Sequence, residues 1–124
     1  MTAQPLTEAQ HGALRALLRV ERAQVLRRLA SLERTFDEIV DAADLEPPDD
    51  EHDPDGTTAY ERAQVTSLVV EARARLLQVD RALAGVDGED HGACERCGHP
   101  IGWPRLQALP ATLRCVQCAT RRPG

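Results

Sequence analysis

The sequence contains very few aromatic residues and no lysine. Phe36, Tyr60 and Trp103 are the three aromatic rings among 124 residues, although 42% of the chain is apolar. So few large side chains argue against a thick globular core. The dominance of Leu, Val and Ala instead favours long helices that pack along narrow apolar faces. Because all 15 basic residues are Arg, we attribute the lack of lysine to a GC-rich coding sequence rather than to a recognition role.

Export and membrane signals are also missing. The N-terminal residues MTAQPLTEAQ do not combine a basic start with an apolar run, so they do not resemble a signal peptide. The chain has no apolar stretch of the roughly 18 residues that a membrane-spanning helix needs. We therefore expect a cytoplasmic protein without a membrane partner, in a reducing compartment that disfavours disulfides.

Cysteine is scarce, and its placement is the most specific signal in the chain. Cys94 and Cys97 form one pair, Cys115 and Cys118 form another, and 17 residues separate the pairs. The pattern C-x2-C-x17-C-x2-C is typical of a zinc ion bound by four thiolates in tetrahedral geometry. Gly98 follows the first pair and can adopt the tight turn that such a knuckle needs. The sequence therefore predicts one zinc ion with these four cysteines as its ligands.

Other readings of the cysteines are weaker. Two disulfides would use the same count but fit an exported protein. A thioredoxin-like redox site would lie next to a βαβ pattern, which neither pair has. His91 and His99 flank the first pair, but four cysteines already complete the zinc shell. A closed shell leaves no position for water or substrate, and no Ser/His/Asp or phosphate-binding motif is apparent, so we do not expect an enzyme.

The N-terminal part predicts a long helix. Thr7 and Gln10 have the spacing of a capping box, which opens a helix. The helix should end near Ala43 to Leu45, before Pro47-Pro48, after about 35 residues or roughly 50 Å. A seven-residue apolar repeat runs along it, with Arg22 as the one polar break. Its members are Leu18, Val25, Leu29, Leu32, Phe36 and Ile39.

A second long helix follows a turn-rich acidic loop at residues 46–57. Thr58 and Glu61 suggest a second capping box. The helix should end at Gly85 to Gly88, after about 28 residues or roughly 42 Å. Its apolar repeat alternates spacings of four and three without a break, as in a coiled coil. The members of this repeat are Val65, Val69, Ala72, Leu76, Val79, Leu83 and Val86.

Two long apolar repeats joined by one loop predict a mainly α fold. We expect an antiparallel coiled-coil hairpin over residues 1–88, with its acidic tip at 46–57, and a small four-cysteine zinc finger over 89–124. In the finger, Pro104 should start a single short helix over residues 105–109 that Pro110 stops. Such a small module needs its zinc for stability. Its expected apolar core consists of Ile101, Leu106, Leu109 and Leu113.

Charge is unevenly distributed along a chain whose net charge is −5. Eleven acidic residues and no Arg lie between Asp37 and Glu61. From His91 to the end there are five Arg and one acid, Glu95, so a DNA-binding finger is an alternative. The pI of about 5.3 and the acid inside the knuckle count against it, and we expect no sequence-specific DNA contact. The arginines of this alternative are Arg96, Arg105, Arg114, Arg121 and Arg122.

Three stretches of the C-terminal third resemble the DksA/TraR family of bacterial RNA polymerase regulators. They are GACERCGHPIG at residues 92–102, RLQALP at 105–110 and CVQC at 115–118. The preceding hairpin is also similar to that family, so the resemblance covers nearly the whole chain. It implies a zinc-containing regulator whose hairpin enters the secondary channel of RNA polymerase. Acidic residues at the tip would then approach the active centre and alter the stability of the open complex.

The resemblance also implies which tip residues meet the partner. Well-known family members carry Asp-x-x-Asp-x-Ala, and the matching stretch here is DPDGTTA at residues 53–59. Gly56 stands three residues after Asp53, so Asp55 is the candidate for the second carboxylate and Ala59 for the alanine. Asp53, Asp55 and Ala59 are thus the candidate partner-binding residues of an expected monomer. A hairpin that docks on another protein, and a solvated acidic loop without a partner, remain alternatives.

Overall fold

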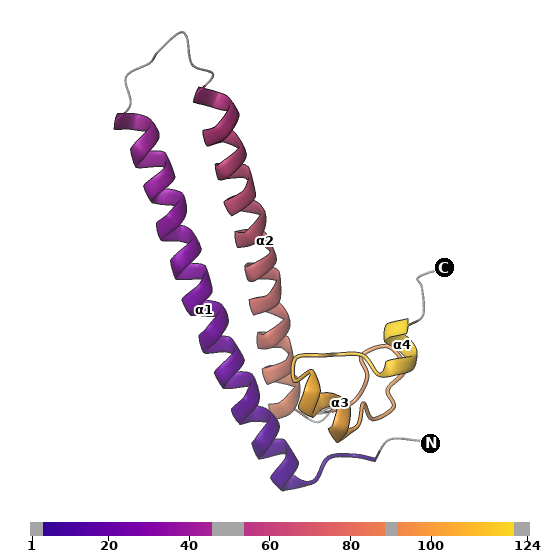
Figure 1. Ribbon diagram of the computed structural model, residues 1–124. Coiled ribbons are helices and arrows are strands. Elements are labelled where there is room, and N and C mark those ends of the chain that lie inside the picture. Colours follow the sequence, from indigo (N-terminus) through magenta and orange to yellow (C-terminus); the bar gives the residue numbers. More distant parts are fainter. Residues whose placement is uncertain (1–3, 46–53, 89–91, 121–124) are drawn as a thin grey trace. The chain divides into compact units, whose positions relative to one another are not determined.

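The computed structural model describes residues 4–45, 54–88 and 92–120 of the chain. The predicted fold class is confirmed, because the described residues are mainly α-helical and contain no strand. Helices α1 (Glu8–Leu45) and α2 (Pro54–Asp87) form the antiparallel hairpin, and the short helices α3 (Trp103–Ala108) and α4 (Val116–Thr120) belong to the finger (Figure 1). Within these ranges, no helix has the length and apolar character needed to span a membrane.

The start and end of α1 agree with the sequence prediction. The Thr7 N–H donates to Gln10 Oε1 at 2.9 Å, and the Gln10 N–H donates to Thr7 Oγ1 at 3.2 Å. These reciprocal bonds satisfy two N–H groups that the first turn of a helix leaves without partners, which confirms the capping box. The helix ends at Leu45, inside the predicted limits.

The predicted start of α2 is wrong. The helix begins at Pro54, so Thr58 and Glu61 lie inside it and do not cap it. Proline suits the first position of a helix because its φ is already helical and its missing N–H would have no partner there. As a result, Asp55 falls in the first turn of α2 rather than in a loop.

The chain divides into two compact units, and each long helix contributes to both. The first unit contains Met1–Ala23 with Leu77–Gly124, and the second contains Gln24–Leu76. We call residues 8–23 of α1 and 77–87 of α2 the hairpin base. In the first unit, the hairpin base and the finger share one apolar core. The buried members of this core are Leu14, Leu18, Val79, Ala82, Val86, Cys94, Ile101, Leu106, Ala111 and Cys118.

The second unit has its own core, in which Val25, Leu29 and Ala72 are buried. Leu32, Val69 and Leu76 are partly buried against them. Along α2 the predicted repeat is confirmed, since its seven positions alternate between buried and half-buried from Val65 to Val86. Such alternation is expected when one face of a helix packs against a single neighbouring helix.

Arg22, the polar break in the α1 repeat, has a partner on α2. Its Nε donates to Asp80 Oδ1 at 2.7 Å, and both side chains are a little more than two-fifths exposed. Arg15 makes a similar ion pair with Asp87 at 2.8 Å. Both pairs join α1 to α2 within the hairpin base.

The finger differs from its prediction in three respects. Helix α3 starts at Trp103 and ends at Ala108, where the Leu109 N–H bonds to the Arg105 carbonyl at 2.7 Å. Leu109 follows the helix and is 47% exposed, so its assignment to the core was wrong. The second helix, α4, was not predicted, because five residues are too few to show a helical period.

Candidate metal centre

Backbone hydrogen bonds fold the first cysteine pair into a tight knuckle. The Cys94 N–H donates to the His99 carbonyl at 2.8 Å, and the Gly98 N–H returns to the Cys94 carbonyl at 2.9 Å. Gly98 has a φ of 77°, a left-handed conformation that glycine adopts without steric cost. The predicted role of Gly98 is thereby confirmed, and the turn brings Cys94 and Cys97 to one side.

The second pair lies at the start of α4. Cys115 precedes the helix directly and Cys118 lies in its first turn, where the Ala119 N–H bonds to the Cys115 carbonyl at 2.9 Å. The Glu95 N–H donates to the Leu113 carbonyl at 2.8 Å, which ties the first knuckle to the segment that leads into the second. The two pairs therefore face each other although they are far apart in sequence.

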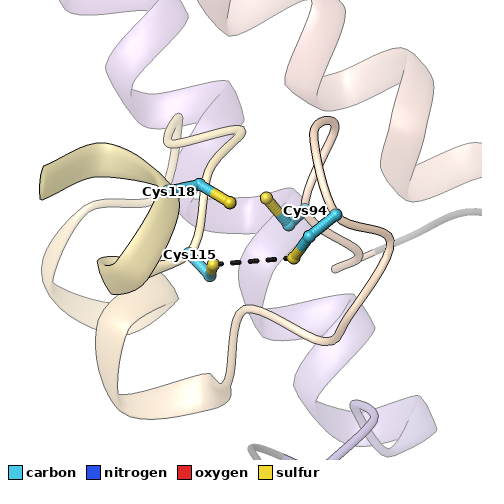
Figure 2. Close-up of side chains that lie close together, drawn as sticks. Cys94, Cys115 and Cys118 are labelled. Carbon is cyan, nitrogen blue, oxygen red and sulfur yellow. Dashed lines mark hydrogen bonds between the residues drawn. The ribbon is translucent and has the colours of Figure 1, made fainter. Parts of the chain in front are cut away.

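The four sulfurs are arranged as a metal site requires. They lie within 4.8 Å of one another, and Figure 2 shows the side chains of Cys94, Cys115 and Cys118 pointing toward a common centre. The Sγ atoms of Cys97 and Cys115 are 3.8 Å apart. Sulfurs bound to a tetrahedral zinc ion at about 2.3 Å are separated by about 3.8 Å, so this distance fits. All four cysteines are free, and a disulfide needs a separation of about 2 Å.

The pKa values of three of the four thiols are shifted by their surroundings. Burial raises the pKa of Cys94, but backbone N–H groups of Cys115, Cys97 and Arg96 outweigh burial and lower that pKa to about 6. The backbone N–H of Cys118 likewise lowers the pKa of Cys115. Burial, together with the neighbouring thiols, raises the pKa of Cys118 to about 12. Sulfurs this close cannot all ionise unless a cation lies among them.

Histidine does not contribute to this cluster among the residues that the structure describes. His99 is exposed, and its backbone carbonyl is engaged by Cys94. His91 lies outside the described residues. The donor set is thus four sulfurs, which is the composition of a structural zinc site rather than a catalytic one.

The candidate tip residues are not part of the metal centre. Asp53 lies outside the described residues, and Asp55 belongs to the first turn of α2. Ala59 also lies in α2 and is half-buried. Ala59 and both aspartates therefore remain predictions about the partner-binding tip.

Two of the finger arginines named for the DNA-binding alternative are used inside the finger. The Arg105 Nε donates to the Arg114 carbonyl at 3.0 Å, and the Arg114 Nε donates to Glu95 Oε1 at 3.1 Å. Arg96 is exposed. Arg121 and Arg122 lie outside the described residues. A phosphate backbone would have to compete with internal acceptors for two of the three described arginines.

Comparison with known proteins places this metal centre in a family. Residues 89–123 match the model of the prokaryotic dksA/traR C4-type zinc finger. The RNA polymerase-binding transcription factor DksA of Escherichia coli K12 is 32% identical over 117 residues, which cover 93% of this chain and 72% of that protein. The chain belongs to the DksA/TraR family. Its four-sulfur site therefore has zinc as its metal, as the family model specifies.

Two further proteins are similar over most of the chain. An uncharacterized protein of Aquifex aeolicus is 34% identical over 99 residues, which span 80% of this chain and 66% of that protein. The structure of transcription factor DksA2 from Pseudomonas aeruginosa has a TM-score of 0.77, covering 94% of this chain and 88% of that chain. At 24% sequence identity, this likeness shows a shared fold.

The sequence does not identify the side chains that connect the finger to α2 and hold it together. From the sequence, Glu95 is only a charge that counts against DNA binding, yet in the structure it bonds to Arg81 and Arg114. No sequence pattern identified above includes Gln78 of α2, whose Nε2 donates to the Ala111 carbonyl of the finger at 2.9 Å. An acid between the two cysteines of a C-x2-C pair was the available signal, but nothing local identifies its partners.

Proposed function

We propose that this chain is a zinc-containing transcription regulator that binds bacterial RNA polymerase and performs no catalysis itself. The observation that carries the proposal is the 32% identity over 93% of the chain to a protein named as an RNA polymerase-binding transcription factor. The helical hairpin and the four-sulfur site support it, because both belong to the same family pattern. A polymerase partner also implies the cytoplasm.

We further propose that Cys94, Cys97, Cys115 and Cys118 are the zinc ligands. The sulfur separation of 3.8 Å between the two knuckles supports this assignment. Zinc supplies a divalent charge that stabilises four thiolates and cross-links the knuckles. The residues of the chain hold the sulfurs in place through the turn at Gly98 and the first turn of α4.

The finer proposal concerns how the hairpin acts. We propose that it enters the secondary channel of the polymerase, with Asp53, Asp55 and Ala59 nearest the active centre. Eleven acidic residues without an intervening Arg between Asp37 and Glu61 support an electrostatic role for this region. Such a field is suited to a narrow cavity that carries positive charge or metal ions.

Replacing one ligand tests the zinc assignment. Freshly reduced protein should contain one zinc per chain, and Cys97→Ser should lose it, because a hydroxyl is a much poorer ligand than a thiolate. Cys97 is exposed, so the change does not open a core cavity. Metal analysis and circular dichroism should show lost zinc with most of the helical signal retained. Ala119→Ser, an exposed change in α4, is the control and should keep its zinc.

Absence of zinc from the reduced wild type would contradict the assignment. So would a Cys97→Ser protein that retains a full equivalent of zinc, since three sulfurs and a hydroxyl should not hold it as well.

The function itself is tested at the tip. Asp53→Asn combined with Asp55→Asn should change transcription initiation in a purified assay while a pulldown with core polymerase still succeeds. Asp55 lies in the first turn of α2, so the loss of its charge should cost at most about 1 kcal/mol of stability. Glu38→Gln with Asp41→Asn is the control, because these exposed acids of α1 precede the tip.

One result would count against polymerase binding, and another would count only against the role of the two tip aspartates. If the wild type does not bind polymerase, the hairpin docks elsewhere, and the general interaction-module alternative is favoured. If the tip variant and the control affect initiation equally, polymerase binding stands but the two aspartates have no special role.

A further inference from the structure

Glu95 occupies an unusual position in the first knuckle. It lies between Cys94 and Cys97, and both of its carboxylate oxygens are engaged by arginines. Oε2 accepts from the Arg81 guanidinium of α2 at 3.1 Å, and Oε1 accepts from Arg114 Nε at 3.1 Å. The carboxylate thus joins a zinc-binding turn to two other parts of the chain.

The backbone of Glu95 adds a third connection. Its N–H donates to the Leu113 carbonyl at 2.8 Å, so the main chain and the side chain of Glu95 both hold the segment before Cys115. Arg114 directly precedes that cysteine, and its carbonyl accepts from Arg105 of α3 at 3.0 Å. The two bonds from Glu95 restrict how the second knuckle can move relative to the first, and the bond from Arg105 holds the segment between them.

The carboxylate is the least exposed of the three charged groups that meet here. The Glu95 side chain is 33% exposed, whereas Arg81 and Arg114 are 60% and 50% exposed. Isolated surface ion pairs contribute little to stability, because two mobile side chains must be ordered for one contact. Here one carboxylate, already fixed through its own backbone, is shared by two guanidiniums, so less side-chain entropy is lost for each contact.

We propose that Glu95 is a positioning residue that holds the two zinc knuckles in register and fastens the finger to α2. The inference rests on the proposed zinc ligands and not on polymerase binding. The Gln78 Nε2 bond to the Ala111 carbonyl at 2.9 Å is a second contact between α2 and the finger. Loss of the Glu95 carboxylate should therefore loosen the metal centre without removing a ligand.

The rate of zinc transfer to a coloured chelator measures this role. Glu95→Ala should release zinc about threefold to tenfold faster than the wild type, because supporting hydrogen bonds around a metal site slow its opening. Glu95→Gln keeps the shape but loses the charge, and its rate should fall between the two. Arg96→Ala is the matched control, since it changes an exposed charged residue in the same turn.

Amide hydrogen exchange gives a readout that does not depend on zinc transfer. In the wild type, the Glu95 N–H should be protected by its bond to Leu113, and Glu95→Ala should reduce that protection although the N–H itself remains. The Gln78 side chain still contacts the finger in this variant, so α2 should keep most of its protection.

Combined substitutions test whether the carboxylate acts through its two arginines. Arg81→Ala and Arg114→Ala should each raise the rate of zinc release. Adding Glu95→Ala to a variant that already carries both arginine substitutions should raise that rate little further. Equal rates for Glu95→Ala and Arg96→Ala, or fully additive effects, would overturn the positioning role while leaving the zinc ligands intact. Zinc-free wild type would instead overturn the ligand assignment and this inference together.

Discussion

Two glycines of the finger show how a single residue can be required for different reasons. Gly98 and Gly92 have φ values of 77° and 75°, which disfavour any residue with a Cβ. At Gly92 an added Cβ would also lie 3.2 Å from the Leu6 side chain, whereas at Gly98 it would meet nothing within 4 Å. The requirement at Gly98 is therefore one of backbone conformation alone.

Gly98→Ala should destabilise the finger by about 1–2 kcal/mol, the usual cost of a left-handed non-glycine residue. Because the turn positions Cys97, zinc transfer to a chelator should also be faster. Gly12→Ala in α1 is the control, since its Cβ also meets nothing within 4 Å and alanine favours helix. A thermal melt in which the two variants behave alike would show that the Gly98 turn tolerates a side chain.

For single residues, the sequence correctly predicted those features that depend only on the spacing of nearby residues. The cysteine pairs and the turn at Gly98 depend on neighbours within a few residues, and the structure has them as expected. The burial of Leu109 was predicted wrongly, because the early end of α3 turns it toward solvent. The contacts of Glu95 could not be predicted, because its partners are 14 and 19 residues away.

Among the elements, the long periodic patterns and the limits of α1 were predicted correctly, but the start of α2 was not. The α2 repeat extends over many turns, so each position adds to the same signal. Its start depends on one proline, and the Thr58 and Glu61 pair imitated a cap that the helix does not use. The sequence shows Arg22 as a polar break in the repeat, but its pairing with Asp80 depends on how α1 and α2 pack.

Adjacent leucines of α2 offer a matched test of the apolar repeat. Leu76 is partly buried against the core of the second unit, while Leu77 is 62% exposed. Leu76→Ala should lower the free energy of unfolding by about 2 kcal/mol, the lower end for leucine truncation, because the side chain is not fully buried. Leu77→Ala should change it by less than about 0.5 kcal/mol.

Urea or thermal unfolding followed by circular dichroism measures both leucine variants. Leu76→Asp should be worse than Leu76→Ala, since it puts a charge against the apolar core. An unfolding curve that Leu76→Asp leaves unchanged would mean that α1 and α2 do not pair along this face.

For the whole molecule, the fold class could be predicted from the sequence, but which segments share one apolar core could not. The sequence predicted a finger with a small apolar core of its own, held mainly by zinc. In the structure, Ile101 and Leu106 belong to the same core as Leu14, Leu18 and Val79 of the hairpin base. A helical repeat says which face of a helix is apolar, but not which distant segment will cover it.

This shared core predicts that zinc retention depends on a residue far from the cysteines. Leu14 is 2% exposed and lies in the core that contains Cys94 and Cys118. Leu29, on the same helix, is 8% exposed and lies in the separate core of the second unit. Leu14→Ala and Leu29→Ala delete the same atoms from similarly buried positions, so each should cost about 2–5 kcal/mol.

The two leucine variants should differ in how they handle metal. Leu14→Ala leaves a cavity beside the finger, so zinc should pass to a chelator faster than in the wild type, as in local opening of a weakened unit. Leu29→Ala should lower the melting temperature by a similar amount with an unchanged rate of zinc transfer. If both variants release zinc at the wild-type rate, the finger retains its metal without help from the hairpin base. If both variants release zinc faster, the two units unfold together, and their separate cores do not open independently.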